Sequence, residues 1–300
     1  MNILLTGANG FIGKNLIPLL LEKGHKLTLF DLRQNDYFNT NNIQYVIGNI
    51  ASGKGFSDID WNNIDLILHL AAAGVKASNR KLEDCEAVNI NGVKNLLQQI
   101  EGLTKIPRLV FPRTFYEDFI EESDSLKQNP YFFTKYLATK YVQEWAKSNQ
   151  RAQIIFPKIF QAYGPGDDSG NVLSYTLKSL MSNAKTKLSS GKAVRDWIYV
   201  DDLIDLFSAT IEYQQKNQIE YFDFGTGQLT TVREMAEKLV RITNSSNELL
   251  SFDPQLDRQD IELISSAETF VPGWKSNYSI NKGLTLFFEN EKLRQLNTIK

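Results

Sequence analysis

The segment Thr6-Gly7-Ala8-Asn9-Gly10-Phe11-Ile12-Gly13 lies between a short apolar run typical of a strand and an amphipathic stretch typical of a helix. Any Cβ at its glycines would hold the backbone away from a pyrophosphate, whose charge is met by the free amides at the start of the helix. A glycine triplet alone is weak support, but the strand-turn-helix context is the one that a dinucleotide site requires. The segment therefore predicts a turn that binds a dinucleotide.

A carboxylate follows at the end of the next predicted strand. Asp31 stands 21 residues after Gly10. There it can accept hydrogen bonds from both hydroxyls of the adenosine ribose, and it would repel a 2′-phosphate. This favours NAD over NADP. Arg33, two residues on, keeps NADP open, because its side chain could turn onto a 2′-phosphate.

Short apolar runs alternate with amphipathic stretches through the first half of the chain, as in successive βαβ units of a parallel sheet. The predicted strands are residues 3–6, 26–31, 43–47, 66–70, 108–111 and 153–157. The predicted helices are residues 12–23, 86–100 and 131–147. The sequence thus predicts an α/β fold with a Rossmann-type, doubly wound parallel sheet.

The pattern changes to longer loops after residue 157, and Gly164-Pro165-Gly166-Asp167-Asp168 is the strongest break in the chain. We expect an NAD-binding domain over residues 1–157, with a return segment at about 196–226. Residues from about 158 to 195 and from 227 to 300 should form a smaller α/β substrate-binding lobe.

Local signals place three elements in this second half. Val200-Asp201-Asp202 reads as a helix start at which an aspartate caps the helix, and residues 221–224 read as a strand. Thr231 with Glu234 forms a capping box that should open a helix over 232–243.

The composition is that of an ordinary globular chain. Of its 300 residues, 42% are hydrophobic, and 33 Lys and Arg stand against 35 Asp and Glu, so the basic excess typical of nucleic-acid binding is absent. The longest apolar run is shorter than the ~20 residues of a membrane span. We expect no nucleic-acid partner, no membrane and a cytoplasmic location. With Cys85 as the single cysteine, we also expect no disulfide and no metal site.

Tyr131 and Lys135 stand four residues apart on the predicted helix 131–147, so both project from one face. A neighbouring ammonium, together with a positively charged nicotinamide, should favour the phenolate and lower the pKa of Tyr131 from its usual ~10. Such a tyrosine can donate or accept the proton of a sugar hydroxyl while hydride moves to or from nicotinamide. Thr114, after the predicted fifth strand, supplies a hydroxyl that could bind the same substrate oxygen.

Asn129 and Pro130 form a good cap and first turn for this helix. The helix carries more aromatic surface than packing on a sheet normally needs. An ordinary core and a homodimer interface both remain open as explanations. The aromatic residues are Phe132, Phe133, Tyr136, Tyr141 and Trp145.

With these motifs the chain resembles an extended short-chain dehydrogenase/reductase of the nucleotide-sugar epimerase/dehydratase group, from residue 2 to about residue 284. The motifs that carry the resemblance are Gly7-x-x-Gly10-x-x-Gly13, His69-Leu70-Ala71-Ala72, Asn89-Ile90-Asn91-Gly92, Tyr131-x-x-x-Lys135, Tyr163-Gly164-Pro165-Gly166, Arg195-Asp196-Trp197-Ile198-Tyr199-Val200-Asp201-Asp202 and Gly225-Thr226-Gly227.

The resemblance implies NAD as cofactor, a nucleoside-diphosphate sugar as substrate, a homodimer and a role in cell-surface polysaccharide biosynthesis. It implies Thr114, Tyr131 and Lys135 as catalytic residues, and Gln161, Arg195 and Arg258 as substrate-binding residues. Asn49 and Gln161 depart from the Asp and Asn usual in the family, which weakens the adenine contact and shifts the substrate contact. The cofactor residues implied are Gly7, Asn9, Gly10, Phe11, Ile12, Gly13, Asp31, Arg33, Asn49, Ile50, Leu70, Ala71, Ala72, Lys76 and Asn89.

The residues that follow Thr114 help to distinguish between the reactions that the family catalyses. Dehydratases of the family follow the catalytic threonine with Asp and Glu, whereas Phe115 and Tyr116 follow it here, which argues against a 4,6-dehydratase. Epimerases of the family place a longer loop before the catalytic tyrosine than is found here, where Tyr131 lies 17 positions after Thr114. This loop and the stretch Arg258-x-Asp260-x-Glu262 resemble the abequose and paratose synthase type of 4-keto-6-deoxyhexose reductases.

We therefore expect an NADH-dependent C4-ketoreductase of nucleotide sugars. A C4-epimerase that uses the same residues on bound NAD is the close alternative. A non-catalytic NAD-binding sensor is a third hypothesis. It is disfavoured because Tyr131 and Lys135 are both present.

Overall fold

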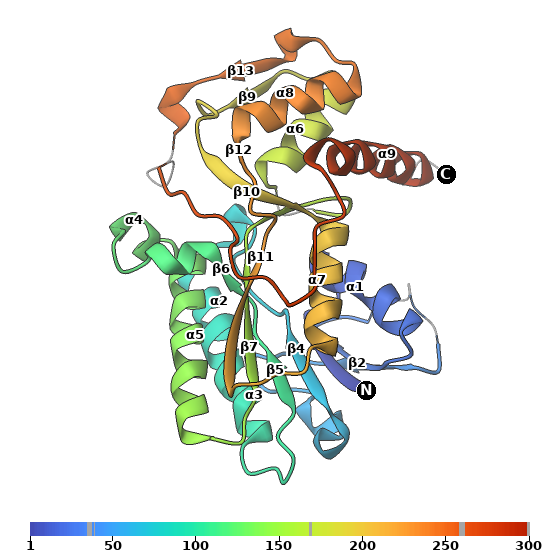
Figure 1. Ribbon diagram of the computed structural model, residues 1–300, viewed down its shortest axis with the longest axis vertical. Coiled ribbons are helices and arrows are strands. Elements are labelled where there is room, and N and C mark those ends of the chain that lie inside the picture. Colours follow the sequence, from blue (N-terminus) through green and yellow to red (C-terminus); the bar gives the residue numbers. More distant parts are fainter. Residues whose placement is uncertain (35–37, 39, 168–169, 258–261, 299–300) are drawn as a thin grey trace. The chain divides into compact units, whose positions relative to one another are not determined.

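The computed structural model describes residues 1–34, 38, 40–167, 170–257 and 262–298 (Figure 1). The chain divides into two compact units. Unit 1 comprises Met1–Lys158 and Leu206–Phe222, and unit 2 comprises Ile159–Asp205 and Asp223–Lys300. The expected division of roles between a cofactor part and a substrate part, with its boundaries at 157 and 196–226, stays a prediction.

Unit 1 is built around a sheet in the strand order β11-β7-β5-β4-β1-β2-β3, with β6 paired to β7. β1 pairs in parallel with both β2 and β4, so the strand order reverses at β1, as in a doubly wound sheet. The predicted α/β class with a Rossmann-like parallel sheet is confirmed. The strands are β1 (Asn2–Thr6), β2 (Lys26–Asp31), β3 (Ile43–Ile47), β4 (Leu66–His69), β5 (Arg108–Val110), β6 (Arg113–Thr114), β7 (Ile154–Ile159) and β11 (Ile219–Phe224).

Helices cover both faces of this sheet, with α3 and α5 on one face and α1 and α7 on the other (Figure 1). The predicted helix 86–100 is divided between a π-helix, η4, and the regular helix α3. The helices are α1 (Phe11–Glu22), α2 (Leu82–Cys85), α3 (Gly92–Ile100), α4 (Asp124–Lys127), α5 (Pro130–Ser148) and α7 (Val200–Glu212), with the short helices η1 (Phe56–Asp58), η2 (Trp61–Asn63), η3 (Ala77–Asn79), η4 (Glu86–Asn91) and η5 (Phe115–Phe119).

Apolar side chains of α3 and α5 pack against the sheet in one buried cluster. Each such side chain contributes ~1.5–3 kcal/mol when it leaves water, so this cluster holds the two helices on the sheet. Its members include Val93, Leu96, Leu97, Ile100, Ala138, Val142 and Ala146 from the helices, and Leu4, Ile67, Leu109 and Ile154 from the strands.

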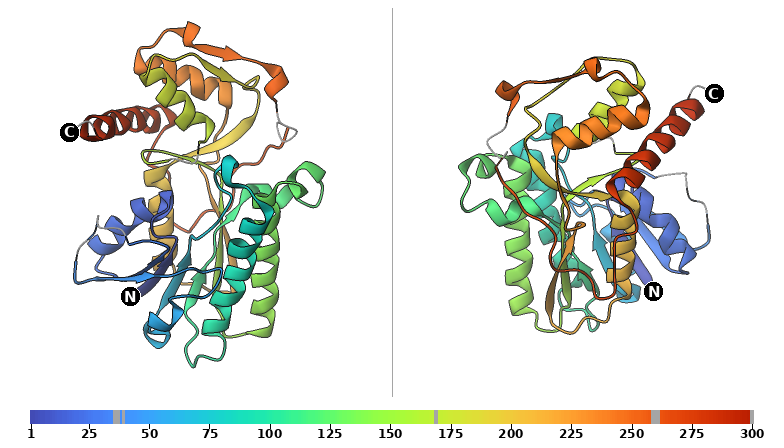
Figure 2. Two further views of the ribbon diagram at one scale, coloured as in Figure 1. Left: turned by 180° about the vertical axis from the view of Figure 1, so that it is seen from behind. Right: turned by 45° about the horizontal axis from the view of Figure 1, so that its top comes forward.

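Unit 2 contains two small sheets, ordered β12-β10-β8 and β13-β9. β10 pairs antiparallel with β12 and parallel with β8. Figure 2 shows from two further sides how the helices of this unit gather about these strands. The elements are β8 (Gln161–Tyr163), α6 (Val172–Met181), β9 (Thr186–Leu188), β10 (Val194–Tyr199), β12 (Leu229–Thr231), α8 (Val232–Thr243), η6 (Asn247–Leu249), β13 (Leu250–Phe252), η7 (Pro254–Leu256) and α9 (Ile280–Thr298).

Helices α5 and α8 begin at the predicted caps. The Asn129 side chain accepts hydrogen bonds from the amides of Tyr131 and Phe132, and α5 begins at Pro130, as predicted. The predicted capping box of Thr231 and Glu234 opens α8.

The aspartate pair at the start of α7 behaves differently. At least one of Asp201 and Asp202 was expected to cap this helix. The carboxylate of Asp202 instead accepts hydrogen bonds from the Ser276 hydroxyl at 2.6 Å and the Asn277 amide at 2.8 Å. It therefore ties the start of α7 to a distant segment of unit 2.

No helix in the described part of the chain is long and apolar enough to cross a membrane. Among the same residues, no group of three or more His, Cys, Asp and Glu side chains is arranged to hold a metal ion.

Candidate active site

The glycine turn joins β1 to α1 at the carboxyl edge of the unit 1 sheet. Gly7 has a φ of +70°, and a Cβ there would lie 2.6 Å from the backbone nitrogen of Ala71. Within the described chain, no side chain caps α1 at its N-cap residue, Gly10. The first amides of α1 therefore remain available to an anion, which the helix dipole also favours. The turn fits the diphosphate of NAD.

Asp31 ends β2 beside this turn. Its carboxylate accepts hydrogen bonds from the amide of Asn9 at 2.9 Å and the amide of Leu32 at 2.7 Å. Asn9 also donates from its side chain to the carbonyl oxygen of Arg33, at 2.6 Å. A carboxylate has about four acceptor sites, so Asp31 retains capacity for ribose hydroxyls. Arg33 itself is exposed.

The loop after β4 forms the opposite wall of the turn. Leu70, Ala71 and Ala72 are partly buried, and the backbone of Leu70 and Ala71 occupies the space that a Cβ on Gly7 would need. This is the point where the strand order reverses, at which open α/β sheets bind their ligands. Lys76 is exposed and precedes η3.

Asn89 lies on the π-helix η4 and is buried. Its side chain accepts a hydrogen bond from the amide of Ala73 at 2.8 Å and donates to the hydroxyl of Thr134 at 2.9 Å. Asn89 therefore fastens the loop after β4 to α5. Its expected contact with the cofactor stays a prediction.

Asn49 and Ile50 were expected to face the adenine. The side-chain oxygen of Asn49 accepts a hydrogen bond from the amide of Ala51 at 2.9 Å, within its own turn. Ile50 is 5% exposed, and its carbonyl oxygen accepts a hydrogen bond from the side chain of Asn95. The expected adenine contacts of Asn49 and Ile50 both stay predictions.

Lys135 projects from α5 into the protein. It is 7% exposed, its Nζ donates to the carbonyl oxygen of Pro112 at 2.7 Å, and the same atom lies 4.7 Å from the ring centroid of Phe111. Desolvation lowers the pKa of Lys135. Thr114, the third expected catalytic residue, ends β6 two residues after Pro112 and is partly buried.

The expected lowering of the Tyr131 pKa is wrong for the chain itself. Desolvation, followed by the negative charge of Glu117, raises the pKa of Tyr131 to about 12, while Arg80 acts in the opposite direction. The guanidinium carbon of Arg80 lies 5.9 Å from the centroid of the Tyr131 ring. Lys135, whose ammonium group donates to the carbonyl oxygen of Pro112, does not offset these two effects. At neutral pH the phenol therefore carries its proton.

The two carboxylates nearest to Thr114 in sequence are both bound to other groups of the protein, Glu117 in the interior and Asp118 at the surface. Glu117 is 4% exposed and accepts hydrogen bonds from the amide of Thr114 at 2.8 Å and the hydroxyl of Thr139 at 2.7 Å. Asp118 pairs with Arg113 and with Lys158. Sequence reasoning gave neither Glu117 nor Arg80 a role. The Thr-x-x-Glu pattern of a capping box was the available signal for Glu117.

His69 ends β4 next to these groups. Its Nδ1 lies 2.9 Å from the hydroxyl oxygen of Thr6, and its ring stacks on Phe111 with the centroids 5.3 Å apart. Burial, with a smaller effect of the Lys135 charge, lowers the pKa of His69 from 6.5 to about 3. His69 is thus a neutral histidine of the core.

This pKa predicts an acid-sensitive fold. His69 has a pKa of 6.5 in the unfolded chain and about 3 in the folded chain. Between these two pH values the unfolded chain binds a proton at His69 and the folded chain does not. One such proton lowers the free energy of unfolding by ~1.4 kcal/mol for each pH unit. Urea unfolding between pH 7 and 5 should therefore show a steeper loss of stability in the parent than in His69→Gln. Equal slopes would contradict the assignment.

Unit 2 carries two of the expected substrate-binding residues. Gln161 begins β8 and is partly buried. Arg195, on β10, is 6% exposed and donates to the carbonyl oxygens of Val194 at 2.8 Å and Leu263 at 3.0 Å. Arg258 lies outside the described residues. Binding of substrate by these three residues stays a prediction.

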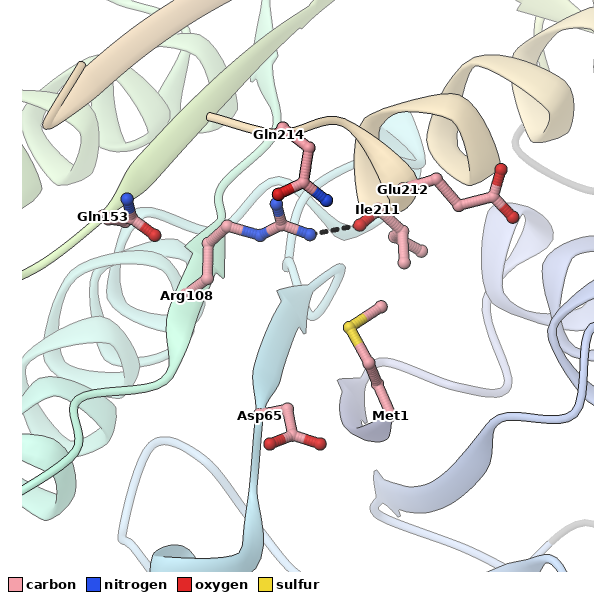
Figure 3. A pocket seen from close by; sticks show the side chains of 7 residues that line it. All are labelled: Met1, Asp65, Arg108, Gln153, Ile211, Glu212 and Gln214. Atoms are coloured by element: carbon pink, nitrogen blue, oxygen red, sulfur yellow. Dashed lines mark hydrogen bonds between the residues drawn. The ribbon is translucent and has the colours of Figure 1, made fainter. Parts of the chain in front are cut away.

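A cavity of about 450 Å³ lies at the amino ends of the unit 1 strands, at the edge opposite the glycine turn (Figure 3). Arg108, which lines this cavity, donates to the carbonyl oxygens of Ile211 and Tyr213 at the C-terminal end of α7, where the helix dipole favours a positive charge. Its charge thus stabilises this helix end, and we do not assign the cavity to the candidate site. The lining residues are Met1, Asp65, Arg108, Gln153, Ile211, Glu212 and Gln214.

The model of the NAD dependent epimerase/dehydratase family matches residues 3–222. A dTDP-4-dehydro-6-deoxyglucose reductase of Escherichia coli is 26% identical over 258 residues, which cover 79% of this chain and 80% of the relative. A UDP-glucose 4-epimerase of Halalkalibacterium halodurans is 25% identical over 308 residues, covering 93% and 91%. The solved UDP-glucose 4-epimerase of Thermotoga maritima with UDP-glucose shares the fold, with a TM-score of 0.81 and 24% identity over 98% of this chain and 100% of that one.

Proposed function

The chain belongs to the NAD-dependent epimerase/dehydratase family and takes NAD as its cofactor, and on this premise we propose that it reduces the C4 ketone of a nucleoside-diphosphate 4-keto-6-deoxyhexose. The glycine turn, Asp31 and the loop after β4 would hold the cofactor. When bound, the cofactor supplies a nicotinamide ring that exchanges a hydride with the substrate carbon.

Residues of this chain would donate the proton and orient the ketone. The phenol of Tyr131 would donate its proton to the C4 oxygen as that oxygen becomes a hydroxyl. Thr114 would hold the same oxygen by a hydrogen bond. The ammonium group of Lys135, bound to Pro112, would hold the cofactor ribose and add positive charge near the phenol.

The observation that carries this proposal is the likeness to a reductase of this substrate class, the dTDP-4-dehydro-6-deoxyglucose reductase of Escherichia coli. With a pKa of about 12, Tyr131 keeps its phenolic proton at neutral pH, as a proton donor to the C4 oxygen must. The internal bonds of Glu117 and Asp118 argue against the dehydratase reaction, because elimination of water requires a carboxylate that reaches the substrate.

A C4-epimerase that recycles tightly held NAD is the second candidate. It is supported by the near-complete coverage of this chain and of the Halalkalibacterium halodurans epimerase in their alignment. The hydrogen bonds of Asn9 to Asp31 and to Arg33 hold together the part of the turn that would bind the adenosine ribose. Such a preformed site is what an enzyme that retains its NAD requires. A homodimer, a role in polysaccharide synthesis and the abequose and paratose synthase type of substrate stay predictions.

The test compares the two reactions on one preparation. Under the proposal, NADH absorbance falls in proportion to the amount of nucleotide 4-keto-6-deoxyhexose added. A parallel incubation with nucleotide hexoses and catalytic NAD should leave the sugars unchanged. Conversion of a hexose to its C4 epimer with no net change of the cofactor would replace the reductase by the epimerase.

A further inference from the structure

The carboxylate of Glu117 is buried between β6 and α5. One of its oxygens accepts from the amide of Thr114, and the other accepts from the hydroxyl of Thr139. The Nε of Arg113 lies 4.0 Å from the second oxygen. A buried charge is costly unless it is paired and hydrogen-bonded, so this position demands the chemistry of a carboxylate. A glutamine could accept only one of the two hydrogen bonds, because its amide group has a single acceptor oxygen.

These bonds join the two segments that carry the expected catalytic residues. Thr114 supplies its backbone amide from the end of β6. Thr139 lies one turn beyond Lys135 on α5, and Lys135 lies one turn beyond Tyr131. Glu117 thus joins the Thr114 strand end to the tyrosine helix, in addition to the bond of Lys135 to Pro112.

Several charged or titratable groups face this part of the site. Lys135 of α5 and Arg113 of β6 face Glu117. Desolvation lowers the pKa of Lys135, and the negative charge of Glu117 opposes this shift. Arg80, after η3, and Cys85 of α2 face Tyr131, where Glu117 raises the pKa of the phenol and Arg80 lowers it. Burial raises the pKa of Glu117 itself. Glu117 is the carboxylate that acts on both members of the tyrosine–lysine pair.

We propose that Glu117 is a positioning residue of the active site, which holds Thr114 and α5 in one arrangement through its two hydrogen bonds. Its effect on rate rests on the proposed function. Its effect on the ionisation of Tyr131 does not.

The first experiment measures that ionisation in the intact protein without substrate. Ultraviolet difference spectra between each variant and the same variant carrying Tyr131→Phe isolate the tyrosinate signal of Tyr131. In the parent the signal should be absent at pH 10, two units below the pKa of about 12. In Glu117→Gln the signal should appear at lower pH than in the parent. Glu122→Gln, an exposed acid five residues on, should match the parent.

The second experiment measures NADH-dependent turnover of the nucleotide 4-keto sugar. Because small misplacement of a catalytic group costs up to ~10²-fold, kcat should fall about 10- to 100-fold in Glu117→Gln, with the KM for NADH nearly unchanged. Thr139→Val removes one hydrogen bond and keeps the charge. It should lower kcat and leave the onset of the tyrosinate signal at the parent value, and it also serves if Glu117→Gln does not fold.

The outcomes separate this proposal from the proposed function. An unchanged tyrosinate onset in Glu117→Gln, or parent-like turnover in Thr139→Val, would overturn the positioning role. If the onset shifts while the parent reduces none of the ketones, the effect of the Glu117 charge is supported and the proposed reaction is overturned.

Discussion

Replacement of Tyr131 by phenylalanine is expected to lower turnover by about three orders of magnitude, within the ~10²–10⁴-fold range that a positioned general acid contributes. The pKa of about 12 keeps the phenolic proton in place at neutral pH, and phenylalanine has no proton to give. The helix itself should survive, because its cap, Asn129, and its bonds from Lys135 and Thr139 do not involve the phenol. Stopped-flow or steady-state loss of NADH absorbance measures the effect.

Tyr141→Phe is the matched control, since Tyr141 lies on the same helix and is 36% exposed. It removes the same oxygen and should leave turnover within about twofold, as surface substitutions usually do. NAD affinity, measured by calorimetry, should be similar in both variants. Retention of more than a tenth of the parental kcat by Tyr131→Phe would assign the proton to another donor.

The local sequence predicted the position of Tyr131 but not its ionisation. The spacing of Tyr131 and Lys135 correctly places both residues on the helix that Asn129 caps, because capping and helical periodicity are local properties. The direction of the pKa shift was wrong for the chain without its cofactor, because it depends on desolvation and on Glu117, which lies 14 residues earlier in the chain. Contacts of that kind form only when β6 and α5 pack together.

The first βα unit was predictable for a similar reason. The apolar run of β1, the glycine-rich turn and the amphipathic start of α1 lie within a short window of the sequence. The π-helix at Glu86–Asn91 was not, since apolar spacing resembles that of an ordinary helix. Its side chain Asn89 bonds to Ala73 and Thr134, 16 and 45 residues away, so tertiary hydrogen bonds accompany the wider turn.

Unit 2 depends still more on distant partners. Asp202 looked like a helix cap because aspartate at a helix start usually is one. Its bonds to Ser276 and Asn277 join segments 74 and 75 residues apart. Nothing in the residues next to Asp202 indicates that segment.

Alanine at Gly7 is expected to abolish NAD binding at millimolar concentration and to destabilise the fold by ~2–5 kcal/mol. About 1–2 kcal/mol comes from holding a non-glycine residue at a positive φ, and the remainder comes from overpacking. The clash is with the backbone of Leu70 and Ala71, 2.6–2.7 Å from the new Cβ, and backbone cannot rotate away as a side chain can. Any relief must open the junction of β1 and β4, where the diphosphate would bind.

Gly24→Ala is the matched control, because Gly24 has a φ of +76° and its Cβ would meet nothing within 4 Å. It should cost only the backbone strain of ~1–2 kcal/mol and leave NAD affinity at the parental value. Urea unfolding and calorimetric titration of NAD measure both effects in both variants. Equal destabilisation by the two substitutions would mean that the loop after β4 moves to make room for the methyl group. NAD binding by Gly7→Ala would show that the turn holds the cofactor without its close contact with Ala71.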